Sequence, residues 1–268
     1  MSRRTRVVTP IFEMPLYTTE AIILRTYKLG EADRIVVFLT RDRGKRRGVA
    51  QGARRMRSRF GGALEPLTRV EVTYFEKESR ELVSLNYAEP LSSPLWSVRA
   101  DALGHTGYFA ELIDECALEG DADERLYRLG SSLIDALAAG VPIEALARYF
   151  EYWLLRLQGV YPTQLACSVC GRQLGQEAAT SAVLMPGERV YRCAPCAGSA
   201  AGRAVSLSGE AVAFLRGAAR VGPDRIEGLA PSPRALRELE AVHRTLIAAH
   251  LEKDLKSARV LRELRGQS

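Results

Sequence analysis

Hydrophobic and polar positions follow two different periods along this chain. From Tyr17 to about Tyr87, apolar residues occur in short runs or alternate with polar residues, the period of β-strands. The predicted strands contain residues 21–24, 35–39, 48–50, 70–75 and 82–87. Between the second and third, Asp42 and Gly44 favour a tight turn. Five strands with no long helical pattern among them predict a small closed barrel, with the OB fold as the leading candidate.

The period becomes helical after Pro90 and Pro94. Apolar residues then recur at helical spacing in three segments, which contain residues 109–116, 126–137 and 143–157. Their expected ends are marked by Asp121 or Asp123 as a cap, Pro142 in a first turn and Gly159 as a stop. Residues 211–219 and a longer segment after Pro233 predict further helices. We interpret the apolar stripes as the core of a helical bundle rather than as a binding groove.

These periods predict an α+β protein: an N-terminal five-stranded OB-type β-barrel, then an α-helical domain with an inserted four-cysteine zinc module. The expected units are an extension at 1–13, an OB domain at 14–90, helical parts at 91–164 and 201–268, and a zinc module at 165–200. We expect this extension to be disordered or to reflect a misassigned start. No apolar run approaches the ~20 residues of a membrane span, and no signal-peptide pattern is present. We therefore expect a cytoplasmic, nucleoid-associated protein with reduced thiols and no membrane partner.

Charge is distributed unevenly along the 268 residues, whose net charge is +6. Residues 91–164 carry 5 Lys/Arg against 11 Asp/Glu, whereas residues 1–90 carry 18 against 11. The densest basic stretch is 41–59, where Asp42 faces nine cations: Arg41, Arg43, Lys45, Arg46, Arg47, Arg54, Arg55, Arg57 and Arg59. A phosphate backbone would neutralise such a stretch, so we interpret it as a nucleic-acid surface; the alternative is a solvated loop. Tyr27 and Phe60 are the candidates for stacking on bases.

Two C-x-x-C pairs, Cys167/Cys170 and Cys193/Cys196, are separated by 22 residues. Four thiolates complete a tetrahedral shell around Zn²⁺ and leave no open position for a substrate. We expect one structural zinc per chain. A rubredoxin-like iron site and a redox dithiol or disulfide are the alternatives. Cys116 lies on an apolar helical stripe, so we expect it to pack in the core.

The remaining polar candidates indicate no catalytic site. His105, His243 and His250 are the only histidines, and we expect His243 and His250 to be half-buried residues with satisfied hydrogen bonds rather than ligands of a metal or a phosphate. Glu111, Asp114 and Glu115 are more typical of a solvated helical face than of a metal site. The sequence has no P-loop, no Gly-x-Ser-x-Gly elbow and no His-x-Glu zinc-deaminase triplet. We therefore expect a protein that is not an enzyme.

Several sequence blocks resemble the bacterial RecO recombination-mediator family, a group of DNA repair proteins. They are Thr19–Leu24, Lys28–Val36, Gly44–Arg54 and Leu251–Arg259. The resemblance implies an OB barrel, a helical domain with a zinc module, binding to single- and double-stranded DNA, and annealing of complementary strands. It implies RecR and the acidic C-terminal tail of single-strand-binding protein as partners. The implied task is helping RecA to load onto coated strands during recombinational repair.

The resemblance also extends the set of candidate DNA contacts. Positions carried over from the family blocks are Lys28, Arg34, Lys45, Arg46, Arg54 and Arg55, and the basic stretch adds Arg43, Arg47, Arg57 and Arg59. The residues also leave two other functions open. An RNA-binding or transcription-associated protein would use the same OB and zinc modules, and an iron redox protein would use the same cysteines.

Overall fold

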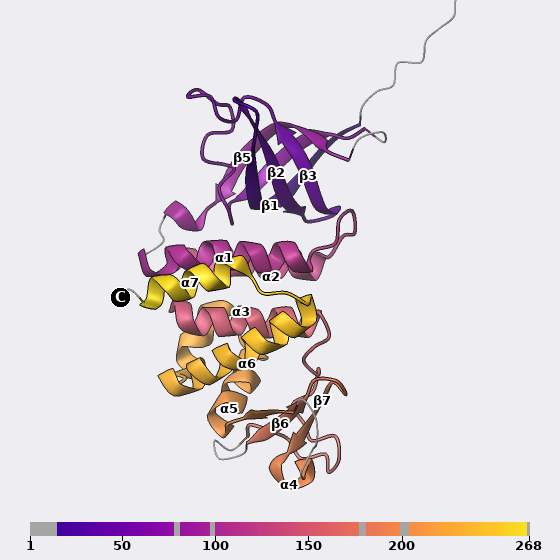
Figure 1. The fold of residues 1–268 in the computed structure, drawn as a ribbon, viewed down its shortest axis with the longest axis vertical. Helices are drawn as coiled ribbons and strands as arrows, with labels where there is room; N and C mark the ends of the chain where they lie inside the picture. Colours follow the sequence, from indigo (N-terminus) through magenta and orange to yellow (C-terminus); the bar gives the residue numbers. More distant parts are fainter. Residues whose placement is uncertain (1–14, 78–80, 97–99, 177–180, 199–203, 267–268) are drawn as a thin grey trace, which may run out of the picture.

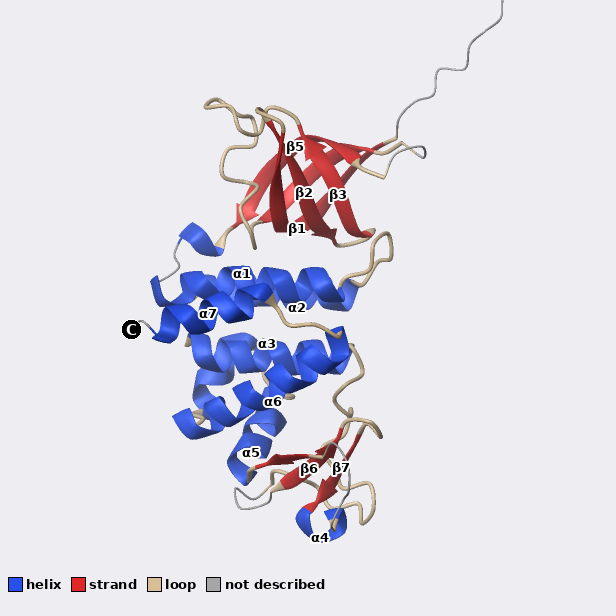
Figure 2. Cartoon of the chain, viewed as in Figure 1, coloured by secondary structure: helices blue, strands red, loops and turns tan. Residues whose placement is uncertain are grey.

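The computed structural model describes residues 15–77, 81–96, 100–176, 181–198 and 204–266. The extension expected at 1–13 lies outside these residues. The barrel and the cysteine module occupy opposite ends of an elongated molecule, with the helices between them (Figures 1 and 2). No helix among the described residues is both long and apolar enough to cross a membrane.

The first five strands form a closed barrel in the order β1-β2-β3-β5-β4. The strands are β1 (Leu16–Leu29), β2 (Asp33–Thr40), β3 (Gly44–Ala50), β4 (Arg69–Phe75) and β5 (Val83–Ser92). Strands β3 and β5 pair in parallel, and all other neighbours in the barrel are antiparallel. This order confirms the predicted OB-type architecture. Strand β1 is much longer than its apolar run, because its polar last residues still pair with β2.

Strand β3 begins at Gly44 and therefore includes Lys45 and Arg46, which lie before the predicted strand at 48–50. Gly44 follows the tight turn with a φ of +69°, a conformation that glycine adopts without strain. A Cβ at this position would lie 2.2 Å from the carbonyl oxygen of Asp121. The turn thus lies directly against the loop between the first two helices, so only a residue without a side chain fits.

Seven α-helices and a second, small sheet follow in the described residues. The helices are α1 (Ala100–Cys116), α2 (Glu124–Ala138), α3 (Ile143–Leu157), α4 (Ala194–Ala197), α5 (Gly209–Ala218), α6 (Pro233–Leu251) and α7 (Lys256–Gly266). Strands β6 (Ala182–Met185), β7 (Val190–Cys193) and β8 (Val205–Leu207) form a sheet in the order β7-β6-β8. Two 3₁₀ helices, η1 (Pro94–Trp96) and η2 (Pro223–Leu229), complete the elements. Of the two candidate caps for α2, the structure uses Asp123, which accepts from Leu126 N at 3.0 Å.

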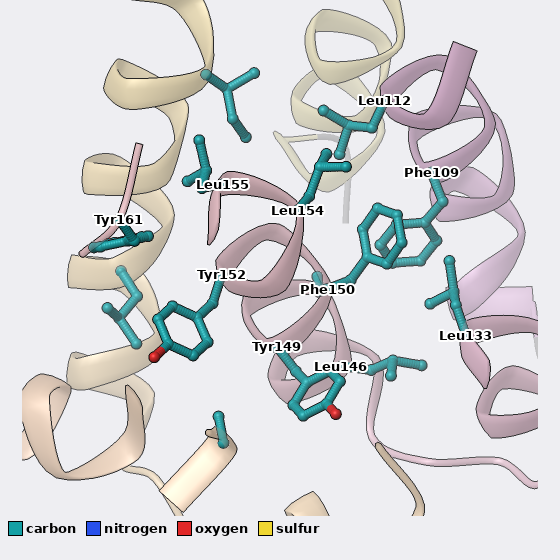
Figure 3. Packing of buried hydrophobic residues seen from close by; sticks show 14 of the residues in the cluster. Phe109, Leu112, Leu133, Leu146, Tyr149, Phe150, Tyr152, Leu154, Leu155 and Tyr161 are labelled. Carbon is teal, nitrogen blue, oxygen red and sulfur yellow. The ribbon is translucent and has the colours of Figure 1, made fainter. Parts of the chain in front are cut away.

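Two hydrophobic cores hold the molecule together, and the division between them follows the barrel wall and not the boundary between the barrel and the helices. The barrel interior is one core, centred on Phe38 and Tyr74. The other core includes the outward-facing barrel residues Ile22, Leu24 and Val37, and it continues through the helices into the cysteine module. Figure 3 shows its helical centre, where the rings of Phe109 and Phe150 meet edge to face, 5.2 Å apart. Helix α1 therefore buries apolar surface against both the barrel and α3.

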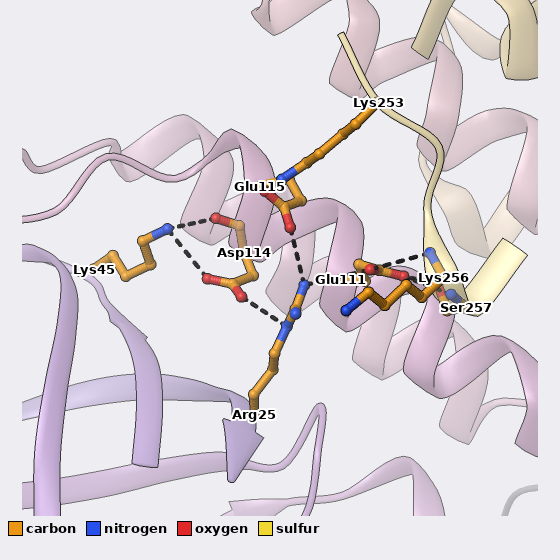
Figure 4. Close-up of polar contacts among 8 residues, drawn as sticks. All are labelled: Arg25, Lys45, Glu111, Asp114, Glu115, Lys253, Lys256 and Ser257. Atoms are coloured by element: carbon orange, nitrogen blue, oxygen red, sulfur yellow. Dashed lines mark hydrogen bonds and ion pairs between the residues drawn. The ribbon is translucent and has the colours of Figure 1, made fainter. Parts of the chain in front are cut away.

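Charged groups surround the apolar contact between the barrel and α1 (Figure 4). Asp114 on α1 lies 2.7 Å from Arg25 Nε and 3.1 Å from Lys45 Nζ, both on barrel strands. Glu115 pairs with Arg25 at 3.2 Å and with Lys253 of the α6–α7 loop at 2.5 Å. Glu111 accepts from Ser257 N at 2.7 Å. These three carboxylates therefore connect the barrel, α1 and the start of α7.

This arrangement corrects the expectation of a solvated face for the three carboxylates. The exposed fractions of the Glu111, Asp114 and Glu115 side chains are 10%, 14% and 22%. Spacing on one helix showed that they share a face but did not reveal the barrel that covers it. Burial acts to raise the pKa of Glu115, but Lys253 and Arg25 outweigh it and lower this pKa.

We predict that Asp114→Ala lowers the free energy of unfolding by about 2 kcal/mol, because it leaves Arg25 and Lys45 without their shared acceptor in a half-buried place. Urea unfolding measures the change. The matched control is Asp135→Ala, which removes an ion pair between Asp135 and Arg69. The Asp135 side chain is 59% exposed. We expect the control to cost less than about 1 kcal/mol. Equal losses in the two variants would contradict a special role for the α1 carboxylates.

Candidate nucleic-acid interface and metal centre

The strongest concentration of unpaired positive charge lies where the β1–β2 turn meets the β3–β4 loop. Lys28 on β1 pairs in register with Arg34 on β2, and Arg34 pairs with Ala50 at the end of β3. Arg54 fixes the loop to the turn: its backbone N donates to Ala32 O at 2.9 Å, and its Nη1 donates to Gly30 O at 2.7 Å. We call this end of the barrel the basic mouth, and it comprises Lys28, Arg34, Arg54, Arg55, Arg57 and Arg59.

The β3–β4 loop has an apolar side that fixes its arginines in place. Phe60, Ala63 and Leu64 are buried in the barrel core, whereas Arg54, Arg55, Arg57 and Arg59 are exposed. The structure therefore corrects the stacking prediction for Phe60, whose side chain is 2% exposed and not available to a base. Its neighbouring arginines had suggested an exposed position, but the apolar residues that follow it draw the ring inward. Arg59 covers the ring, with its guanidinium 5.1 Å from the ring centre.

The ten candidate cations fall into two groups. Seven form no ion pair with a carboxylate of the described residues: Lys28, Arg34, Arg47, Arg54, Arg55, Arg57 and Arg59. The other three have internal partners. Lys45 binds Asp114, Arg46 pairs with Glu76 at 3.6 Å, and Arg43 lies over the ring of Tyr17 at 3.8 Å. The basic stretch thus divides between a structural end beside the helices and an unpaired end at the mouth.

Tyr27 lies beside the mouth and keeps its place as a stacking candidate. It is 46% exposed on β1, next to Lys28. The mouth also has a depression lined by Asp33, Gln51, Gly52, Arg55 and Arg59. Asp33 Oδ1 accepts from Gly52 N at 2.8 Å, which holds the start of the loop. An aromatic ring beside unpaired cations can contact both the bases and the phosphates of a strand.

The four cysteines of the two C-x-x-C pairs come together at the far end of the molecule. Their Sγ atoms all lie within 4.8 Å of one another, and Cys170 Sγ is 3.7 Å from Cys193 Sγ. The first pair lies in a turn that bonds to β7 through Ser168 N and Tyr191 O, 2.8 Å apart. Gly171 closes this turn with a φ of +72°, a left-handed conformation that glycine adopts without strain. The second pair spans the end of β7 and the start of α4.

This cluster fits a metal ion. In a tetrahedral shell with Zn–S bonds of ~2.3 Å, the sulfur atoms are about 3.8 Å apart, close to the Cys170–Cys193 distance. Cys167 and Cys193 are buried. Burial acts to raise the pKa of Cys167, but hydrogen bonds from the backbone N–H groups of Cys170, Cys193 and Val169 outweigh it and lower this pKa. Four cysteines this close can hold a metal ion.

Two features of the helical domain were missed by the sequence analysis. The first is a buried polar network. His243 Nδ1 donates to Glu151 Oε2 at 2.8 Å, while Glu151 Oε1 accepts from Tyr108 OH and Arg148 Nη2, each at 2.7 Å. Burial lowers the pKa of His243 and outweighs the opposite effect of Glu151. Burial opposes ionisation of Glu151, but Arg148 and its hydrogen bonds lower its pKa. His243, which was expected to be half-buried, is fully buried, and His250 is exposed. His105 is buried as well.

The second feature is a groove of about 240 Å³ between α2 and α3. Its walls are apolar, with Leu129 on α2 and Tyr149 and Trp153 on α3, while Arg125 and Arg128 lie along one side. Trp153 is held by a hydrogen bond from Nε1 to Ala218 O at 3.1 Å. The apolar stripes of the helices predicted core here, and most of their residues are core. The groove forms where half-buried residues of two stripes remain uncovered.

Comparisons with known proteins match both halves of the chain. The family model described as "Recombination protein O N terminal" matches residues 14–94, and "Recombination protein O C terminal" matches residues 99–259. A DNA repair protein RecO from Geobacter metallireducens is 36% identical over 248 residues, or 92% of this chain and 97% of that protein. One from Koribacter versatilis is 41% identical over 167 residues, or 61% of this chain and 67% of that protein. One from Bifidobacterium adolescentis is 32% identical over 255 residues, or 92% and 100%.

We predict that Phe60 acts as an anchor of the loop and not as a stacking platform. Phe60→Ala should lower the free energy of unfolding by about 3–5 kcal/mol, because it leaves a cavity in the barrel core. Phe60→Leu keeps an apolar side chain and removes the aromatic ring, so its affinity for single-stranded DNA should stay within about twofold of the unmodified protein. Thermal unfolding and fluorescence anisotropy measure these effects. A folded Phe60→Leu variant with much weaker DNA binding would restore the stacking role.

Proposed function

We propose, because this chain belongs to the RecO family of DNA repair proteins, that it binds single- and double-stranded DNA through the basic mouth and anneals complementary strands. The observation that carries this proposal is the set of six mouth cations, which have no ion-pair partner among the described residues. An unpaired cation keeps its charge available for a phosphate, and each phosphate contact releases condensed counterions.

Annealing requires no catalytic group. Two DNA strands repel each other through their phosphates, and a cationic surface that holds both lowers this repulsion. Contacts to phosphates leave the base edges free to pair. The mouth suits this task because its arginines lie on a loop whose other side is fixed in the barrel core. The charges are thus held near one another before any strand arrives.

We further propose that the protein acts with RecR and single-strand-binding protein to help load RecA onto coated strands. The groove between α2 and α3 is a candidate site for the acidic C-terminal tail of single-strand-binding protein. Arg125 and Arg128 offer positive charge to acidic residues, and Trp153 and Leu129 offer an apolar surface. The basic mouth would then receive the strand that the tail brings close.

We also propose that the cysteine cluster holds one structural zinc ion. With four thiolates bound, the ion would have no open position for water or substrate. Its role would be to tie the turn of Cys167 and Cys170 to β7 and α4. A small module gains stability from such a crosslink, because the metal binds the folded arrangement of the four thiolates.

We predict that two pairs of substitutions separate strand binding from tail binding. The assay is annealing of complementary oligonucleotides without ATP, either bare or coated with single-strand-binding protein. Arg55→Glu with Arg57→Glu should weaken binding to bare single-stranded DNA by about tenfold or more and slow annealing in both formats, because it reverses two phosphate contacts. Arg125→Glu with Arg128→Glu should slow annealing of coated strands and leave bare strands unaffected.

The matched control is Arg220→Glu with Arg225→Glu, which makes the same change in net charge on exposed residues elsewhere in the helical domain. It should anneal at the unmodified rate. Unchanged affinity and salt dependence in the Arg55/Arg57 variant would remove the mouth from the mechanism. A strong preference of the unmodified protein for structured RNA over single-stranded DNA would favour an RNA-binding function instead.

We predict that the purified protein contains about one zinc per chain, because a complete four-thiolate shell binds one ion. Cys170→Ala should remove the ion while sparing the core, since Cys170 is the exposed member of the set. Cys116→Ala is the control and should retain the metal. Elemental analysis by mass spectrometry measures the content. Stoichiometric iron with visible colour, or full metal content in the Cys170 variant, would contradict a four-cysteine zinc site.

A further inference from the structure

We propose that the outer face of α6 is a second nucleic-acid surface, which holds the backbone of a second strand while the basic mouth holds the first. We call this face the α6 stripe, and it consists of Arg234, Arg237 and Arg244 on α6 together with Arg262 on α7. The proposal rests on the proposed annealing function, since it assigns a place to the second of the two strands.

The three α6 arginines lie on the helix face opposite the core. Residues 234, 237, 241, 244 and 248 follow one another at spacings of three or four, so they share one side of the helix. The opposite side contains the buried residues Leu239, Val242 and Leu246. Ala241 stands between Arg237 and Arg244 on this outer side and is exposed. Its short side chain leaves room for a phosphate backbone to approach the helix closely.

The carboxylates of α6 are directed to internal partners, which leaves the arginines unpaired. Glu238 Oε1 accepts from Ser208 N at 2.6 Å, and Glu240 Oε2 pairs with the buried Arg148 at 3.5 Å. Arg234, Arg237 and Arg244 are exposed and form no ion pair with a carboxylate of the described residues. A helix that carries both signs of charge thus presents an outer face on which Arg237 and Arg244 are positive, while Arg234 also lies near Glu210 of α5.

Helix α7 extends this charge. Arg262 is exposed on α7, and it lines the same small hollow as Arg244. Lys253 and Asp254 lie at the edge of that hollow with opposite charges. From Arg234 to Arg244 the stripe runs about 15 Å along the axis at ~1.5 Å per residue. That length spans about four phosphates of one strand at the ~3.4 Å spacing of a duplex.

The stripe is separate from the basic mouth. Figure 1 shows α6 below the barrel, with α1, α2 and α3 in the layers between them. These helices belong to neither basic surface, so a short strand bound at the mouth does not extend easily to the stripe. Two basic surfaces divided in this way favour two separate strands.

The composition of the stripe favours a nucleic acid over an acidic protein. Specific protein interfaces are centred on buried aromatic or large apolar anchors. Among the described residues, α6 contributes none of the exposed large hydrophobic side chains, and α7 contributes Val260. Arginine and alanine alone provide charge and close approach without an anchor, as contacts to a phosphate backbone require.

The test is capture of a second strand by the full-length protein. Protein saturated with a donor-labelled oligo(dT) receives an acceptor-labelled oligo(dT) of equal length, which cannot pair with the first. Energy transfer then reports the ternary complex. Arg237→Glu with Arg244→Glu should weaken capture of the second strand by about tenfold and leave affinity for the first within about twofold. The salt slope of capture should fall by about 1.4, since each single-strand phosphate contact contributes about 0.7.

Arg220→Glu with Arg225→Glu serves again as the control of equal charge and should capture the second strand normally. If the Arg237/Arg244 variant captures the second strand as well as the unmodified protein does, the α6 stripe is not the second surface, even if the protein anneals DNA. If capture is unchanged but annealing of coated strands slows, the stripe serves an acidic protein, which also overturns the proposal. Failure of the unmodified protein to bind the first strand would instead refute the proposed function itself.

Discussion

The contact between α1 and the barrel is the constraint on which the rest of this structure depends. Its apolar part buries Ile22, Leu24 and Val37 against the helices, and its polar part pairs Arg25 and Lys45 with the carboxylates of α1. This contact fixes which end of a very basic barrel faces the helical domain. Cations at that end are neutralised inside the molecule, and those at the other end remain unpaired. The direction in which the barrel presents its charge therefore follows from three acidic residues on a helix outside it.

A similar arrangement recurs on α6, where the acidic side chains pair with internal partners and the arginines face outward. Glu151 lies in the core between Arg148, Tyr108 and His243, and Glu240 pairs with Arg148 from α6. Breaking such a network would leave a buried charge without a partner, which is costly. The network therefore fixes the orientation of α6 on α3 even where its net contribution to stability is small. The outward direction of the α6 arginines is a consequence of this fixed rotation. Local charge pairing in the core thus determines the charge pattern on the surface.

Much of the fold could be predicted from the sequence because local periodicity and residue spacing determine the strands, the helices and the cysteine pairs. Alternation at Val70, Val72 and Tyr74 predicted β4, and the two C-x-x-C pairs predicted the four-cysteine cluster. The failures have a common physical cause, which is that a one-dimensional pattern does not show what covers a residue. Phe60 was expected to be exposed among arginines and is buried, whereas Lys45 was expected at DNA and binds Asp114. The groove beside Trp153 and the face of Arg237 and Arg244 depend on how helices pack, which no spacing along one helix reveals.

The outward-facing barrel residues belong to the same core as the helices and the cysteine module, and this has a consequence for how the protein folds. Removing the helices would leave Ile22, Leu24, Val37 and Leu39 in water on one side of an otherwise complete barrel. The sequence segments that correspond to the two family models are therefore not two independent thermodynamic units. We infer that the barrel and the helical layers unfold together in one cooperative transition. The boundary near residue 94 separates two sequence segments but does not separate two units that unfold independently.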